Sequence, residues 1–306
     1  MCAFPDTTAW RHIMRYKSKG YTIFTFFNYI FLSLVGFACL YPLYYVVIAS
    51  FSDPVKLISH DGMLLLPLKK FTLDGYRMVF SNRLVMSGYR NTLIVLFLGL
   101  CFNMVLTVMG AYVISLRKIM LRKFFTIMII VTMYFNGGMI PTYLNVQSLG
   151  MIDSLWSLII PGAITTSNLL IMRSAFMAVP ESLSEAAEID GAGHRQILLQ
   201  VLLPLVKATL AVLVLYYGVA HWNAWFNASI YLRSASKFPL QLVLRNILIE
   251  GLNNDMLTDV GSADNPQAVQ LLKYSLIVVS TVPIMCIYPL LQKFFEKGVM
   301  LGAVKG

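Results

Sequence analysis

The chain has 306 residues, of which 58% are hydrophobic and 12% are charged, and its mean hydropathy is +0.71. A soluble domain carries about a quarter charged residues, so this composition excludes an ordinary soluble protein and indicates the membrane class. The formal net charge is +10, but the basic residues are scattered among short loops, which favours contact with membrane lipid over a nucleic-acid partner.

The N-terminal segment, residues 1–23, is basic and leads into a long apolar run. That run is longer than the core of a signal peptide and has no evident cleavage site, so we interpret it as a retained membrane anchor. A membrane-crossing helix needs about 20 mostly apolar residues. Six stretches qualify, and they cover residues 24–51, 89–115, 123–144, 154–178, 205–232 and 273–295. The sequence therefore predicts an all-α membrane protein with six transmembrane helices over residues 24–295 and a tail over residues 296–306.

The distribution of lysine and arginine predicts the orientation of these spans, because cytoplasmic loops carry more positive charge. Residues 1–23 and the loop over residues 117–123 are dense in positive charge, whereas the loop over residues 141–154 has none. Both termini and the loop over residues 180–204 are therefore predicted to face the cytoplasm. The longer connections, residues 52–88 and 233–272, are predicted to lie outside.

The two outer connections differ in pattern. The first contains LDGYRMVFSN, in which Leu73, Tyr76, Val79 and Phe80 follow helical spacing. This pattern predicts a short amphipathic helix at the membrane surface. The second contains LNNDMLTDVGSADNP, which is polar and rich in turn-forming residues, so no rigid structure is expected there.

The loop between the fourth and fifth spans reads ESLSEAAEIDGAGHRQILLQVLLP over residues 181–204. Ser182 and Glu185 have the spacing of a capping box, so a helix is predicted to begin here. Gly191 and Gly193 are predicted to end it, because glycine reaches the left-handed conformation that often follows a helix.

A second short helix is predicted over residues 194–203, closed by Pro204, so two short helices meet at a bend of glycines. Ala186 and Ala187 would leave a flat surface for a partner protein, and Glu185 and Glu188 could pair with basic residues of that partner. The alternative is a solvated loop that only joins two spans. Composition alone leaves both interpretations open.

The order of residues in this loop resembles a known signature. Glu185-Ala186-Ala187, Gly191, Val201 and Leu203-Pro204 match the pattern EAA-x3-G-x9-I-x-LP, with Val201 in place of isoleucine. This is similar to the signature loop in membrane subunits of ATP-binding-cassette (ABC) importers. Further matches resemble the smaller six-span subunit of the maltose-type importer, a carbohydrate permease: Tyr76, Asn91-Thr92-Leu93, Ala111-Tyr112, Pro180-Glu181, Asp190-Gly191-Ala192 and Trp222-Asn223.

The ending QKFFEKGVMLGAVKG, residues 292–306, is similar to the tails of a subgroup associated with complex oligosaccharides, including uronic-acid polymers such as alginate. The resemblance implies the type I ABC importer permease fold and a bacterial cytoplasmic membrane location. It also implies that the chain forms half of a translocation pathway for oligosaccharides. The partners implied are a second permease subunit, two ATPase subunits and an extracytoplasmic solute-binding protein.

ATP and Mg are expected on the partner ATPase, because this sequence has no GxxxxGK[ST] motif. No cofactor and no catalytic residue are expected in this chain. In the family, the two short helices seat in a groove of the ATPase, and closure of the ATPases on ATP rocks the spans. The resemblance assigns this coupling role to Glu185, Ala186, Ala187, Asp190, Gly191, Ala192 and Pro204. It also implies a second ATPase contact in the tail, at Gly302, Lys305 and Gly306.

Polar residues within the spans are candidates for the sugar path, since such residues are rare in lipid. These candidates are Asn223, Asn227, Trp225, Asn136 and Asn168. Asn223 and Asn227 are predicted on one face of the fifth span, with His221 and Trp225 on another. Amides and aromatic rings suit sugars, but interhelical hydrogen bonding and interfacial anchoring are the alternative, also for Asn103.

The four cysteines, at Cys2, Cys39, Cys101 and Cys286, are interpreted as small hydrophobic residues, because no CxxC pair or histidine at metal-ligand spacing accompanies them. Neither a disulfide nor a metal site is predicted. Two other functions stay as alternatives. An ion-coupled secondary transporter or channel usually places ionisable groups at mid-membrane, and these spans lack buried acids. A permease for a non-sugar solute also stays possible as an interpretation of the sequence, because no motif here identifies the transported solute.

Overall fold

The computed structural model describes residues 19–60, 62–68, 71–117, 119–249 and 266–303. Every regular element in these ranges is a helix, which confirms the all-α prediction. The chain divides into two compact units, residues 1–72 and 73–306. Each unit is described by itself.

The first unit is built on α2 (Lys19–Ser50), a 32-residue helix that contains Pro42. Residues 20–50 of this helix are long and apolar enough to cross a membrane. Its aromatic and aliphatic side chains are mostly exposed, as expected for a helix whose solvent is lipid. A short helix, α3 (Pro54–Ile58), follows, and the Asp53 carboxylate caps it by accepting the N–H of Val55 at 3.0 Å.

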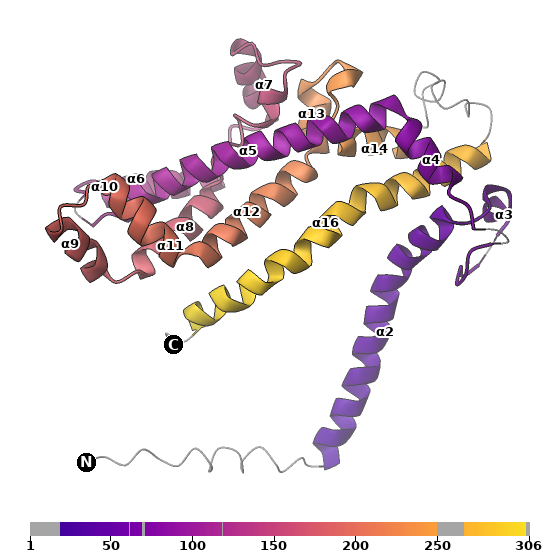
Figure 1. Ribbon diagram of the computed structural model, residues 1–306, viewed down its shortest axis with the longest axis horizontal. Coiled ribbons are helices and arrows are strands. Elements are labelled where there is room, and N and C mark those ends of the chain that lie inside the picture. The colour runs from indigo at the N-terminus through magenta and orange to yellow at the C-terminus, as the bar shows by residue number, and fades with distance from the viewer. Residues whose placement is uncertain (1–18, 61, 69–70, 118, 250–265, 304–306) are drawn as a thin grey trace. The chain divides into compact units, whose positions relative to one another are not determined.

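The second unit is organised around α5 (Arg83–Ser115), a 33-residue helix that begins at Asn82, whose side chain accepts the N–H groups of Leu84 and Val85. Figure 1 shows α12 (Lys207–Trp222) packed along α5, with α16 (Pro266–Ala303) along α12. A shorter helix, α8 (Thr166–Ala178), also packs on α5. The long helix thus connects two ends of the unit.

Three described helices are long and apolar enough to span a membrane: Gly20–Ser50, Arg83–Ser115 and Gln267–Ile287. Two bent pairs raise this number to as many as five. Arg122–Tyr134 (α6) and Met139–Ser148 (α7) meet at 111°, and His194–Leu205 meets Lys207–Trp222 at 85°. By length and composition the described residues thus contain three to five candidate spans, and some of the six predicted spans are interrupted by breaks.

Glycine and proline explain the breaks. Gly138 precedes α7 with φ 88°, a left-handed conformation that interrupts the third predicted span. The fourth predicted span contains a 3₁₀ helix, η1 (Leu155–Leu158), and then α8 of only 13 residues. The turn between η1 and α8 contains Pro161, whose missing backbone N–H removes one helical hydrogen bond and favours a break there.

The helix α4 (Asp74–Ser81), which was predicted to lie at the membrane surface, packs with its buried residues Gly75 and Val79 against α16. Val79 is completely buried there, and Gly75 approaches Ser275 so closely that an added Cβ would lie 2.1 Å from its Oγ. The helix is amphipathic as predicted. Val79 packs on a neighbouring protein helix, while Leu73 and Phe80 of the predicted apolar face are exposed, and the location at the membrane surface stays a prediction.

The second outer connection contains an unpredicted helix, α14 (Leu240–Ile249), with Leu240, Val243 and Ile247 in the core. A helical turn, α13 (Trp225–Tyr231), and a 3₁₀ turn, η3 (Ala235–Lys237), precede it. The polar stretch that was expected to lack rigid structure lies, up to residue 265, outside the described residues.

Candidate functional site

We call residues 180–206 the elbow. Its first limb is α9 (Glu181–Ile189), which begins one residue before the predicted cap. Ser182 therefore lies inside the helix, and Pro180 occupies the capping position without a side-chain hydrogen bond. The predicted capping box is wrong, because proline at this position sets the extended backbone from which the helix starts.

The bend after α9 is a Schellman motif. Gly191 is left-handed, with φ 83°. Its N–H donates to the carbonyl of Glu188 at 3.1 Å, and the N–H of Ala192 donates to the carbonyl of Ala187 at 2.9 Å. These two bonds satisfy carbonyls that the helix end would otherwise leave unpaired. The spacing of the alanine and the glycine in the EAA-x3-G pattern is therefore the spacing of a helix stop.

The second limb is a continuous helical segment made of α10 (His194–Gln196), η2 (Ile197–Leu202) and α11 (Leu203–Leu205). The side chain of Gln196 begins it by accepting the N–H of Gly193 at 2.9 Å. The middle section, η2, has the wider turns of a π-helix. They precede Pro204, whose ring would clash with the preceding turn of a regular α-helix.

Pro204 was predicted to close the second limb, but the helix continues through it to Leu205. The break comes at Val206, which has φ −106° and ψ 23°. From there α12 leaves at 85° to the second limb. Proline is tolerated inside the segment because the π-helical turns before it already lack the regular α-helical bond pattern. The limb is thus joined to α12 by a sharp corner.

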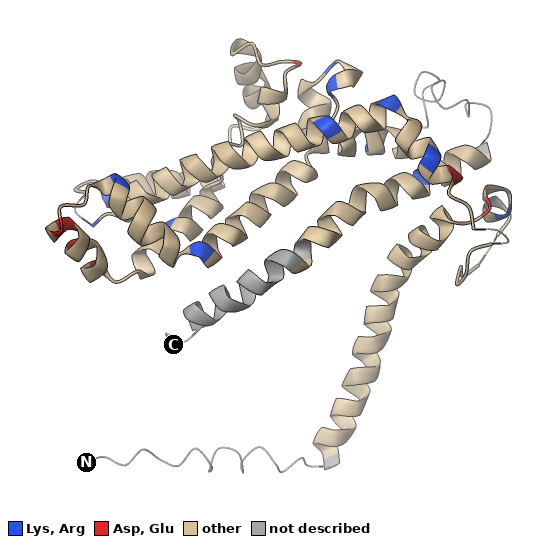
Figure 2. Cartoon of the chain, viewed as in Figure 1, with Lys and Arg blue, Asp and Glu red and all other residues tan. Residues whose placement is uncertain are grey.

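The signature residues of the elbow divide into outward and inward groups. Glu185, Ala186 and Asp190 are exposed, whereas Ala187 and Ala192 are half-buried and pack against the core between α5 and α8. The two consecutive alanines therefore do not share one surface. In Figure 2 acidic residues, coloured red, gather on α9, at one end of this unit. Ile189 is 87% exposed beside them. The outer face of α9 therefore presents acidic side chains together with one exposed apolar side chain.

Two side chains near the C-terminal end of α5 contact the elbow. Tyr112 Oη lies 2.9 Å from Nδ1 of His194 on the second limb. Just beyond α5, Arg117 Nη1 lies 2.9 Å from Oε2 of Glu181 on the first limb. A cavity of about 260 Å³ between α5, α8 and the elbow is lined by these four residues, together with Glu185.

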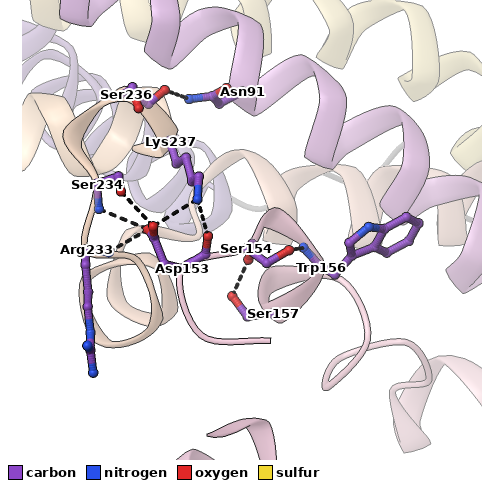
Figure 3. Close-up of polar contacts among 9 residues, drawn as sticks. All are labelled: Asn91, Asp153, Ser154, Trp156, Ser157, Arg233, Ser234, Ser236 and Lys237. Carbon is purple, nitrogen blue, oxygen red and sulfur yellow. Dashed lines mark hydrogen bonds and ion pairs between the residues drawn. The ribbon is translucent and has the colours of Figure 1, made fainter. Parts of the chain in front are cut away.

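A second polar cluster lies at the junction of residue 153 with the segment after α13. The Asp153 carboxylate accepts hydrogen bonds from the Ser234 hydroxyl, from the Lys237 ammonium and from the backbone N–H groups of Ser234 and Arg233, and these hold its pKa well below the usual range (Figure 3). Asp153 itself has φ 57°, an uncommon conformation for a residue other than glycine. This cluster was not predicted from the sequence.

The proposed sugar-path residues are spread over several elements. Asn223 and Asn227 are exposed, but α12 ends at Trp222 and α13 begins at Trp225, so the predicted common helical face does not exist. Trp225 is 39% exposed, and its ring lies 4.9 Å from Cζ of Arg245.

The other two candidates have local contacts. Asn136 Oδ1 accepts the N–H of Gly138 at 2.9 Å, in the break between α6 and α7. Asn168 is buried near the start of α8. None of the contacts described above places Asn136 or Asn168 next to Asn223, Trp225 and Asn227. The assignment of these candidates to a sugar path stays a prediction.

Asn103 and His221 form hydrogen bonds between helices, which was the alternative to a role in the sugar path. Asn103 Nδ2 donates to the carbonyl of Gly162 at 2.9 Å, and its Oδ1 lies 2.9 Å from Nε2 of His221. Gly99 makes room for this contact, since an added Cβ would lie 2.5 Å from that nitrogen. These bonds join α5 to α12 and to the turn before α8, as buried polar groups in packed membrane helices do.

Three predictions concern the ends of the chain and its cysteines. Gly302 falls in the last turn of α16, while Lys305 and Gly306 lie outside the described residues. Cys39, Cys101 and Cys286 are free thiols. Within the described ranges, no group of three or more metal-binding side chains comes together.

Comparison with known proteins identifies the family. The pattern of the family described as "Binding-protein-dependent transport system inner membrane component" matches residues 119–301, more than half of the chain. The chain belongs to this family. This permease is 38% identical over 286 residues to the "Polygalacturonan/rhamnogalacturonan transport system permease protein YtcP" of Bacillus subtilis (strain 168), covering 93% of this chain and 99% of that protein.

Two further relatives agree with this membership. The permease is 36% identical to "Protein LplC" of Bacillus subtilis (strain 168), covering 95% of this chain and 98% of that protein. A chain in the "Crystal structure of a bacterial ABC transporter involved in the import of the acidic polysaccharide alginate" is 31% identical and has a TM-score of 0.86, covering 92% of this chain and 100% of that one. The expected type I permease fold and the transport function are confirmed, and the chain is an inner-membrane transport subunit, not an enzyme.

Proposed function

We propose that this permease forms half of the translocation pathway of an ABC importer for acidic oligosaccharides, of the uronate-containing class. The support comes from similarity over nearly the whole chain to a polygalacturonan/rhamnogalacturonan permease and to a chain of an alginate importer. Both relatives are named for polymers of acidic sugars. A second permease subunit, two ATPase subunits and an extracytoplasmic solute-binding protein complete the assembly. ATP and Mg bind the ATPase chains.

The observation that carries the mechanism is the shape of the elbow. Its Schellman bend at Gly191 projects two limbs from the bundle, and the outer face of α9 presents Glu185, Asp190 and exposed Ile189. Acidic side chains around an apolar residue suit a groove in another protein that has basic edges. We propose that this face docks on the ATPase from the cytoplasm. Both termini lie on the same side of the membrane as the elbow.

The elbow converts motion because its second limb is a continuous helical segment that meets α12 at a sharp corner. When the ATPases close on ATP, the docked elbow moves with them, and the corner at Val206 passes this motion to α12. The polar side chains Asn103 and His221 hold α12 to α5, so the two helices move together. The pathway then opens alternately to the two sides.

The experiment is ATP-dependent uptake in proteoliposomes that contain the complete importer with its solute-binding protein. We expect unlabelled oligogalacturonate or oligoalginate to compete for uptake of a labelled acidic oligosaccharide, and neutral maltodextrin to compete poorly. Competition by maltodextrin alone would contradict the acidic class. Absence of any ATPase in the purified complex, or uptake of a non-sugar solute instead, would contradict the importer assignment.

A further inference from the structure

Besides the apolar packing of its second limb on the cluster that includes α5, the elbow makes one polar side-chain contact with the C-terminal end of α5 on each side of its bend. Before Gly191, Glu181 of the first limb pairs with Arg117 at 2.9 Å. After Gly191, His194 of the second limb bonds to Tyr112 at 2.9 Å. Because one contact starts from the last turn of α5 and the other from two residues beyond its end, both limbs are connected to the same end of that helix.

The first limb lies at the surface of the unit. Among its residues none is buried, and Ala187 is the one that packs on the neighbouring core cluster. The pair between Arg117 and Glu181 is itself partly exposed, with side chains 65% and 43% exposed. Pairs of this kind contribute little to stability. The contact therefore directs the limb, and its removal leaves the fold intact.

The contact to the second limb is better enclosed. Tyr112 is only 8% exposed, and its ring meets Phe176 of α8 edge-on, at 6.3 Å between ring centroids and 83° between planes. The same ring meets the imidazole of His194 at 6.1 Å. Phenylalanine would keep both ring contacts and lose only the hydroxyl, so the hydrogen bond can be removed without opening a cavity.

The opposite end of α5 is also fixed to its surroundings. Asn91 Nδ2 donates to the carbonyl of Ser236 at 2.8 Å (Figure 3). Thr92 Oγ1 accepts the N–H of Leu240 at 2.9 Å. Twenty residues separate Thr92 from Tyr112, a distance of about 30 Å along the helix. A rotation or shift of α5 at the elbow therefore reaches the segment that leads into α14.

We propose that Tyr112 and Arg117 are positioning residues that join the two limbs of the elbow to α5, so that motion of the ATPase is delivered to α5 as well as to α12. This inference rests on the proposed function, because it requires that the elbow docks on an ATPase. The role of these two side chains is to maintain the angle between the elbow and α5 while the ATPases move.

The test uses the complete importer in proteoliposomes and measures uptake and ATP hydrolysis together. In Tyr112→Phe we expect ATP hydrolysis to continue and uptake per ATP to fall about fivefold, the factor that follows from losing one ordinary hydrogen bond. Tyr216→Phe, which changes an exposed tyrosine of α12, is the matched control and should leave the ratio unchanged.

The ion pair is tested by reversal. Arg117→Glu and Glu181→Arg should each lower uptake per ATP, and the double variant, which restores the pair with opposite polarity, should recover it. A merely structural role would change the amount of assembled complex without changing this ratio. Failure of the double variant to recover the ratio, or an unchanged ratio in Tyr112→Phe, would overturn the inference. Lack of ATP-driven uptake by the unaltered importer would instead overturn the proposed function.

Discussion

Gly191 shows how one residue determines the geometry of the elbow. It is left-handed, and no atom lies within 4 Å of the position that a Cβ would occupy. Space is therefore available for a side chain, and the requirement for glycine is purely one of backbone conformation. Gly193, two residues later, has an ordinary φ of −74°. The two glycines of the bend are not equivalent, although the sequence predicted both as helix stops.

This difference predicts unequal effects of alanine. Gly191→Ala places a Cβ in the left-handed region, which costs about 1–2 kcal/mol, so we expect the bend to open and uptake per ATP to fall. Gly193→Ala is the matched control and should transport normally. Uptake and ATP hydrolysis of the two importers check this. Equal activity of both variants would show that the bend tolerates another conformation.

Asp153 gives a prediction about pH. Its pKa is lowered by the hydrogen bonds from Ser234, Lys237 and Arg233. A carboxyl with a lowered pKa contributes stability above the pKa of the unfolded chain, about 3.9, and loses it as the pH falls toward the lower folded value. The cluster should therefore contribute equally at every pH between 5 and 8.

We expect Asp153→Asn to lower the thermal midpoint of the purified protein in detergent, because Lys237 loses its charged partner. The decrease should be the same at pH 5, 7 and 8. Asp74→Asn, at an exposed position of α4 with a weak pair to Arg77 at 3.8 Å, is the control with a smaller effect. A difference between Asp153→Asn and the unaltered protein that changes across this pH range would contradict the assigned ionisation.

At the scale of elements, close packing of α4 on α16 depends on Gly75. An added Cβ would lie 2.1 Å from Oγ of Ser275 and 2.9 Å from Cγ of Leu271. Without such contacts alanine would favour a helix over glycine by roughly 0.5–1 kcal/mol. Here the overlap reverses the sign, since overpacking costs about 1–3 kcal/mol.

Gly75→Ala should therefore lower the thermal stability of the permease, and adding Ser275→Gly should recover part of the loss. Gly218→Ala is the matched helical control, because its nearest atom is 3.8 Å away. Thermal unfolding in detergent checks the series. If Gly75→Ala were as stable as Gly218→Ala, the packing of α4 on α16 would be wrong.

Apolar runs predicted where helices lie, since composition alone marks segments that need a lipid-like or protein-buried environment. They did not predict where helices break. The helices break at Gly138 and around Pro161. Packed membrane helices sometimes contain glycine or proline without a break, so these residues alone do not predict where a helix is interrupted. The same holds for Pro204, which lies inside a helix and not at its end.

The site was only partly predictable for a related reason. The Schellman bend follows from local spacing, and the glycine signal revealed it. The contact between Tyr112 and His194 spans 82 positions in the chain, so no local pattern contains it. The Asp153 cluster joins segments about 80 positions apart, and its residues have turn-forming character that predicts a loop without predicting its partner. Polar contacts between residues far apart in the sequence became visible only once the fold was known.

At the scale of the molecule, the described part of the permease has more exposed large hydrophobic side chains than buried ones. The first unit has a long apolar helix with little core of its own, and the second has three separate buried clusters. A chain of this kind needs lipid and other subunits to cover it. Its transport role depends on those neighbours, and the acidic outer face of α9 is the part that we assign to the ATPase.

The most direct test of this assignment is cross-linking in the assembled importer from single cysteines placed in a cysteine-free background. Ala186→Cys, on the exposed face of α9, should cross-link to the ATPase chain, and addition of ATP should change the yield. Ser229→Cys, an exposed position on α13, should not cross-link to it. Cross-linking from Ser229→Cys and none from Ala186→Cys would contradict the account, as would labelling of Ala186→Cys by a membrane-impermeant thiol reagent added outside intact cells.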